Sequence, residues 1–239
     1  GGELSGSLTY MDVHDRAAKA VAVPESGSHE LRVITPTLLE VYIVSEREGF
    51  AKRPTFCDWV DDEADVIPGA IAVASDLEVT VNGRVTTVSA TGFKRHVRFA
   101  PIDQSKFVME NFLYIELGTT IGTGVTVAVS SPTTKWPSTF VLSAVMDENR
   151  WSPAVHTNQV GYEIGARKTG HVGIWLGTLG EFAVNGSAGF EVINATTNAV
   201  AARGSLTART ETGFQYPPAS GAPDPYLHVY EADFTSLDT

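Results

Sequence analysis

Hydrophobic and polar residues alternate along several short stretches of this chain, which is typical of β-strands with one buried face. The clearest case is Leu77–Val81 followed by Val85–Val88, with Asn82 and Gly83 between them. An Asn-Gly pair in this position is a strong hairpin signal, because a type I′ turn needs positive φ at both central residues. The pattern therefore predicts a β-hairpin over residues 77–88.

Other apolar stretches follow at short intervals, separated by Gly, Pro, Asn and Ser, a spacing typical of β-sandwiches. Around a break at Thr35-Pro36, residues 29–43 predict two short strands or one interrupted strand. Further strands are expected at Lys94–Phe99, Leu113–Leu117, Val125–Val129, Thr139–Val145, Lys168–Leu176, Gly189–Ile193, Ala199–Leu206 and Leu227–Phe234. The Pro-interrupted segments 45–69 and 213–225 predict surface loops.

Composition supports an all-β fold. Charged residues make up only 19% of the chain, and long stretches rich in Leu, Glu and Lys are missing. The polar segment Asp147–Pro153 marks a boundary between two modules, residues 1–150 and 151–239. We therefore predict an all-β chain of two β-sandwich modules.

Charge and cysteine content narrow the function classes. A net charge of -11 and a pI of about 4.9 disfavour nucleic acid and anionic membranes, which both need a positive surface. The single cysteine, Cys57, excludes an intramolecular disulfide. No apolar run of about 18 residues is present, and the first residues lack the features of a signal peptide. We expect a soluble mature chain with no membrane partner.

Two groups of residues are candidates for ligand binding. Asp61, Asp62 and Asp65 lie in an acidic segment whose oxygens suit calcium, although a solvated acidic loop is the alternative that the irregular spacing favours. Trp59 and Trp136 are candidate platforms for sugar rings, the alternative being that each ring packs against its own module. Apart from calcium at the acidic segment, we expect no cofactor.

A cluster of basic residues, Lys94, Arg95, His96 and Arg98, lies in one predicted strand. Alternation along that strand places Lys94, His96 and Arg98 on the same face. A solvated strand face is the favoured interpretation. The histidines lack the short spacings of zinc ligands, and the chain has no G-x-S-x-G, P-loop or dinucleotide-binding motif. Zinc enzymes, serine hydrolases and nucleotide-binding enzymes are therefore excluded.

A polar turn enters a second apolar stretch within residues 152–175. It reads Asn158, Gln159, Val160, Gly161 and Tyr162, with Lys168 shortly afterwards. Gly161 suits a tight turn, and a buried Tyr162 ring needs a partner for its hydroxyl. The amides of Asn158 and Gln159 are candidates for sugar contacts, but in turns such amides more often bond neighbouring backbone.

This segment resembles the opening of the immunoglobulin-like domain that precedes the catalytic module in family 9 glycoside hydrolases, the cellulase-like enzymes. Phe190-Glu191-Val192, Gly204–Leu206 and Asp233-Phe234 have counterparts in that domain. The first module, through Leu31–Val41 and Gly92–Arg95, is similar to an extra β-sandwich that precedes the domain in some bacterial relatives.

The resemblance implies that the second module is immunoglobulin-like and that the parent protein is an inverting glycoside hydrolase that degrades polysaccharide. The family's two catalytic carboxylates belong to a helical barrel, in motifs such as D-A-G-D, which residues 1–239 do not contain. No catalytic residue is therefore assigned. The expected partner is a catalytic module of the same polypeptide, in an extracytoplasmic or secreted protein whose signal peptide has been removed. Alternatives are a carbohydrate-binding module and a cell-surface protein-interaction module.

In the family, the Asp-Phe segment is followed by a Gly-containing turn and a last strand, whereas this sequence ends at Thr239. We therefore expect the second module to lack its last strand. A strand from a second chain, or a displaced terminal region, should then shield the edge left beside Leu227–Phe234 or a neighbouring strand.

Overall fold

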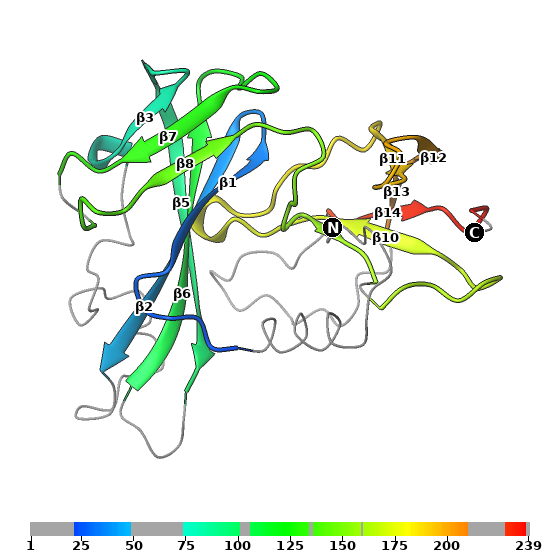
Figure 1. Ribbon diagram of the computed structural model, residues 1–239, viewed down its shortest axis with the longest axis horizontal. Coiled ribbons are helices and arrows are strands. Elements are labelled where there is room, and N and C mark those ends of the chain that lie inside the picture. The colour runs from blue at the N-terminus through cyan, green and yellow to red at the C-terminus, as the bar shows by residue number, and fades with distance from the viewer. Residues whose placement is uncertain are drawn as a thin grey trace, which may run out of the picture. The chain divides into compact units, whose positions relative to one another are not determined.

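The computed structural model describes residues 22–48, 74–100, 106–133, 136–158, 160–209 and 228–237. Their regular structure is antiparallel β-sheet, apart from short 3₁₀ turns at Ala74–Asp76 (η2) and Gly177–Leu179 (η3) (Figure 1). The predicted all-β fold is thereby confirmed. None of the described segments forms a helix long and apolar enough to cross a membrane.

The chain divides into two compact units. The N-terminal unit comprises Val21–Arg150 together with Leu176–Leu179, and the described part of the C-terminal unit lies within Trp151–Trp175 and Gly180–Thr239. A boundary thus falls between Arg150 and Trp151, but a short piece of the later chain belongs to the earlier unit.

The N-terminal unit contains two four-stranded sheets. The first has the order β1-β2-β6-β5 and consists of β1 (His29–Thr35), β2 (Leu38–Glu48), β6 (Lys106–Leu117) and β5 (Val88–Phe99). The second has the order β4-β3-β7-β8 and consists of β4 (Arg84–Thr86), β3 (Glu78–Val81), β7 (Thr126–Ser130) and β8 (Leu142–Val145).

Side chains from both sheets share one hydrophobic core. The first sheet contributes Leu31, Val33, Leu39, Val41, Ile43, Leu113, Ile115 and Leu117, and the second contributes Val79, Val127, Val129 and Leu142. Because strand side chains alternate between faces, each sheet buries one face in this core. The arrangement is consistent with a β-sandwich.

The predicted hairpin is confirmed. Val81 pairs with Arg84, and the turn between them has positive φ at both Asn82 (51°) and Gly83 (74°). The Thr35-Pro36 break separates β1 from β2, so this region forms two strands. By contrast, β5 and β6 each run for 12 residues and are much longer than predicted. Their outer faces carry polar residues, which interrupt the apolar pattern on which the prediction depended.

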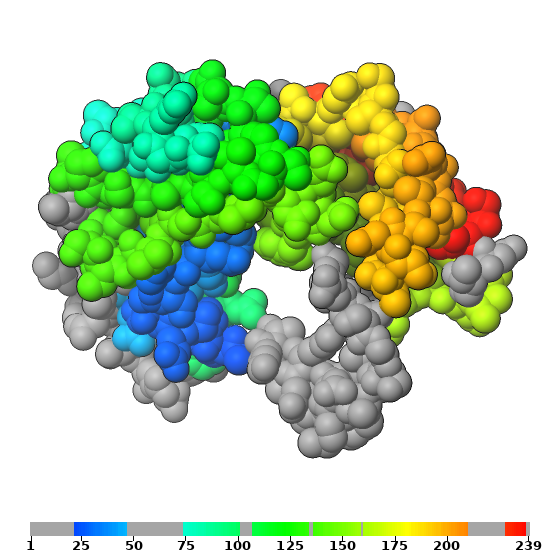
Figure 2. Space-filling model, turned by 45° about the horizontal axis from the view of Figure 1, so that its top comes forward, coloured from blue at the N-terminus to red at the C-terminus, as the bar shows by residue number. Residues whose placement is uncertain are grey.

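The C-terminal unit contains a sheet and a separate hairpin. The sheet has the order β13-β14-β10-β9 and consists of β13 (Thr207–Ala208), β14 (Tyr230–Asp233), β10 (Thr169–Val172) and β9 (Val155–His156). The hairpin consists of β11 (Gly189–Ile193) and β12 (Val200–Ser205). Exposed and half-buried residues alternate along β11, and the hairpin forms part of the unit's surface, orange in Figure 2.

The structure bears on two expectations for this unit. β10 ends at Val172, whereas a strand to Leu176 was predicted, because Leu176 already belongs to the N-terminal unit. β14 pairs with β10 on one side and with β13 on the other, so the expected edge does not lie at β14 itself, and the outer strands of this sheet are β13 and β9.

Candidate functional site

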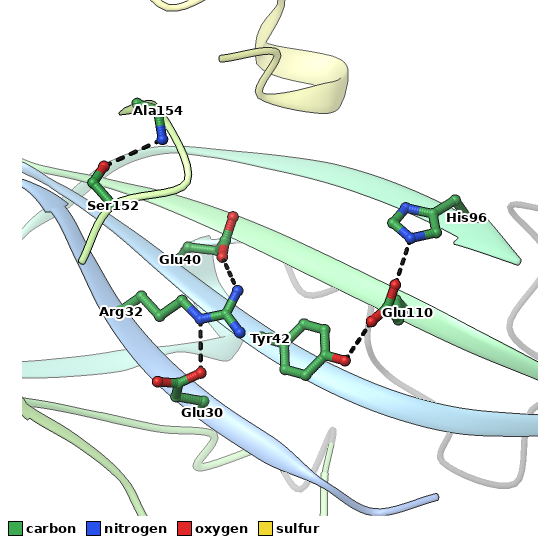
Figure 3. A network of polar contacts seen from close by, with 8 residues as sticks. All are labelled: Glu30, Arg32, Glu40, Tyr42, His96, Glu110, Ser152 and Ala154. Atoms are coloured by element: carbon green, nitrogen blue, oxygen red, sulfur yellow. Dashed lines mark hydrogen bonds and ion pairs between the residues drawn. The ribbon is translucent and has the colours of Figure 1, made fainter. Parts of the chain in front are cut away.

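A network of polar contacts lies on the outer face of the β1-β2-β6-β5 sheet, opposite its core face (Figure 3). Three cross-strand pairings bring the residues together: Arg32 lies opposite Glu40, Tyr42 opposite Phe112, and His96 opposite Glu110. We call these residues, with Glu30 and Lys94, the outer-face network.

A buried ion pair forms one half of the network. Arg32 Nη1 donates to Glu40 Oε1 at 2.9 Å, and Arg32 Nε donates to Glu30 Oε2 at 2.7 Å. The Glu40 side chain is only 1% exposed and that of Arg32 17%. Burial by itself lowers the pKa of Arg32, but Glu40 and Glu30 together raise it above its ordinary value. Arg32 also lies 4.5 Å from the centre of the Tyr42 ring, so that ring has a cation on its face.

In the other half of the outer-face network, Glu110 on β6 joins Tyr42 on β2 to His96 on β5. It accepts a hydrogen bond from Tyr42 Oη at 2.6 Å and one from His96 Nε2 at 2.5 Å. The His96 ring stacks on Phe112 with 5.2 Å between centroids. The hydrogen bond from His96, supported by that from Tyr42, lowers the pKa of Glu110 despite its partial burial. Burial, followed by the bond to Glu110, raises the pKa of Tyr42.

The lowered pKa of Glu110 predicts acid sensitivity. A depressed folded-state pKa contributes stability that is present above the ordinary value of 4.5 and is lost as pH falls through the folded pKa. The free energy of unfolding should therefore fall as pH drops below about 4.5, and Glu110→Gln should reduce this fall. Urea titrations at several pH values measure it. Glu116→Gln, which alters an exposed carboxylate on the same strand, is the control; an equal effect of both variants would contradict the prediction.

Lys94 lies against aromatic rings. Its amine is 4.8 Å from the centre of Phe112 and 5.6 Å from that of Tyr114. Burial lowers the pKa of Lys94, and the nearby Glu40 opposes this shift. Pairing with Phe112 and Glu110 places Lys94 and His96 on one face, as predicted, while a register shift falls at Arg98. His96 and Arg98 are exposed, as a solvated face predicts, whereas Lys94 is half-buried against the rings.

The predicted ligand-binding residues do not meet at this network. Trp136 is 5% exposed and belongs to the core, so its ring is not available to stack on a sugar. Trp59, Asp61, Asp62 and Asp65 lie outside the described residues. Within the described ranges, no group of three or more His, Cys, Asp or Glu side chains is placed to hold a metal.

The motif residues gather at the connection between β9 and β10 in the C-terminal unit. Tyr162 Oη accepts a hydrogen bond from Asn158 N at 3.1 Å and donates one to Thr169 O. Asn158 Oδ1 accepts from Val160 N at 3.0 Å, as turn asparagines commonly do, and Gly161 has a φ of 104°. The Tyr162 ring meets Phe234 edge-on at 5.2 Å. These contacts make Asn158, Gly161 and Tyr162 turn-forming residues; Gln159 lies outside the described residues.

Lys168 is held in place by its backbone. Its N–H donates to Thr235 Oγ1 at 3.1 Å, and its carbonyl accepts from Phe234 N at 3.0 Å. The residue is 4% exposed, and its amine is buried without a hydrogen-bond partner. Buried polar groups normally have partners, so this amine is unusual for a small core.

Sequence reasoning did not find the outer-face network, whose contacts join distant segments. Tyr42 and Glu110, for example, are 68 positions apart. One signal was available: Glu40 interrupts the apolar run Leu38–Val44, and a carboxylate within such a run needs a buried partner.

Comparisons with family models, curated proteins and solved structures found no match to this chain. The likeness to the immunoglobulin-like domain of family 9 enzymes therefore rests on the motif residues alone.

Proposed function

We propose that these residues form two non-catalytic β-sandwich modules, the second immunoglobulin-like, of a secreted, inverting, family 9-like glycoside hydrolase that degrades polysaccharide. Their role is to pack on and position a helical catalytic barrel in the same polypeptide. The observation that carries the proposal is the turn formed by Asn158, Gly161 and Tyr162 beside the buried Lys168. In this turn, residues of the family-like motif contact one another.

The carboxylates of the outer-face network support a structural role for the first module. An inverting glycosidase needs one carboxylate to activate water and another, about 6.5–9.5 Å away, to protonate the leaving group. Glu40 is paired with Arg32, and Glu110 is held by Tyr42 and His96. Both carboxylates are thus already engaged by side chains of the same sheet.

This role predicts that the purified chain has no glycosidase activity. Cellulose, mixed-linkage glucan and aryl glycosides should be hydrolysed no faster than in the absence of protein, because residues 1–239 contain no acid and base pair in the family's catalytic motif. Reducing-sugar and chromophore-release assays measure this. Turnover that survives repurification and is abolished by Glu110→Gln would contradict the prediction.

The proposal as a whole is tested by the coding sequence that follows Thr239. We expect it to encode a helix-rich segment with an Asp-rich catalytic motif. A continuation without such a module would overturn the proposed function and leave the fold of the two units unaffected.

A protein-interaction module is the second candidate, favoured by the exposed apolar side chains of the motif turn. Val160 is 98% exposed and Ile164 81%. Carbohydrate binding has less support, because the described residues expose two large aromatic rings, Phe99 and Trp151, in different units. Retention of the chain on insoluble glucan would favour carbohydrate binding over both other roles.

A further inference from the structure

Residues 174–182 form a closed loop. At its neck, Phe182 N donates to Ile174 O at 3.0 Å, and Trp175 pairs with Glu181 in an isolated β-bridge. At its tip, Leu179 N donates to Leu176 O at 3.3 Å around the single turn of η3. The neck belongs to the C-terminal unit, whereas the tip, Leu176–Leu179, belongs to the N-terminal unit. We call this tip the strap.

The strap binds an edge strand. Thr178 Oγ1 accepts a hydrogen bond from Phe93 N at 3.0 Å. Because β5 is the last strand of the β1-β2-β6-β5 sheet, an amide on its outer side has no neighbouring strand to bond. The strap supplies the missing acceptor at this position.

Contact between the strap and β5 is close enough to require glycine. Gly177 has a φ of 63°, and a Cβ there would lie 1.9 Å from Phe93 O and 2.8 Å from Lys94 N. On the facing strand, a Cβ at Gly92 would lie 2.5 Å from Leu179 Cγ. Leu176 is 3% exposed, so the strap also buries an apolar side chain. Backbone contact, a hydrogen bond and apolar burial together indicate a specific docking site.

We propose that the strap is an integral element of the N-terminal unit and couples the folding of the two units. The loop is closed by contacts at its neck, which form only when that part of the C-terminal unit is folded. A closed loop presents its tip with less loss of conformational entropy than an open chain does. Unfolding of the C-terminal unit therefore removes the edge partner of β5, and loss of the strap weakens the link between the units. This inference does not depend on the proposed function.

The experiment uses the full chain, with differential scanning calorimetry and hydrogen exchange at the Phe93 amide. The wild-type chain should unfold in one transition. Gly177→Ala should displace the strap, separate the unfolding into two transitions, lower one midpoint by at least about 5 °C and accelerate Phe93 exchange at least about tenfold. Gly165→Ala is the matched control, because Gly165 also has positive φ (78°) but nothing within 4 Å of an added Cβ.

Thr178→Val provides a milder test, since it removes the acceptor for Phe93 N and keeps the shape of the side chain. Faster exchange at Phe93 with a smaller fall in the midpoint is expected. Two separate transitions in the wild-type chain would overturn the proposal. So would Gly177→Ala and Thr178→Val variants with one unchanged transition and wild-type protection of Phe93.

Discussion

Replacing Arg32 by Met should lower the free energy of unfolding of the N-terminal unit by about 3–5 kcal/mol, because it leaves a buried carboxylate without its cation. Glu40 is 1% exposed, and its contact with Arg32 Nη1 is 2.9 Å long. At such burial the carboxylate is almost entirely removed from bulk water. The variant also removes the guanidinium from the Tyr42 ring, which adds to the loss.

Two comparisons isolate the buried charge. The double variant Arg32→Met/Glu40→Met should recover most of the stability, since it removes both charges. Arg203→Met breaks a pair of similar length, 2.7 Å to Glu191, whose side chains are 70% and 46% exposed, and should cost at most about 1 kcal/mol. Urea unfolding of the four proteins gives the values. A loss for Arg32→Met no larger than that for Arg203→Met would show that Glu40 is not an obligate partner.

Replacing Lys168 by Met should instead raise the stability of the C-terminal unit, by about 1–3 kcal/mol. The amine is buried without a hydrogen-bond partner, and Met fills a similar volume without a polar group. The backbone bonds of residue 168 to Thr235 and Phe234 do not involve the side chain, so they remain. Thermal and urea unfolding measure the change.

Lys94→Met is the matched control for this gain. The Lys94 amine lies on the Phe112 ring and interacts with Glu40, so its removal should not stabilise the chain. A loss of stability in Lys168→Met would mean that the Lys168 amine is bound in solution by a partner such as a water molecule.

Local patterns predicted the features that depend on neighbours in sequence. The Asn82-Gly83 hairpin is an example, because the positive φ of its turn follows from the two residue types themselves. Features that depend on contacts between distant segments were predicted less well from the sequence. β5 was predicted from Lys94, but it begins at Val88, since its polar outer face is stabilised by β6 and β2 rather than by its own pattern. Trp136 resembled an exposed loop residue, and only the packing of two sheets buries it.

In the candidate site too, local contacts could be predicted from the sequence and long-range contacts could not. The motif turn could be anticipated, because Asn158, Gly161 and Tyr162 lie close in sequence and their contacts are local. The ties between Glu110, Tyr42 and His96 could not, since they depend on which strands become neighbours in the sheet. Lys168 was recognised as part of a motif, yet its unpaired amine is visible only once the core closes around it.

The sequence by itself therefore determined an all-β chain, its turns and most strand positions, because strand alternation and turn conformation depend on adjacent residues. Only the tertiary structure decided which strands pair, which charges are buried together and where the strap docks. These features arise from contacts between segments far apart in the chain. The docking of Gly177 on Phe93 is the clearest case, since nothing near Gly177 in the sequence indicates that another backbone lies against it.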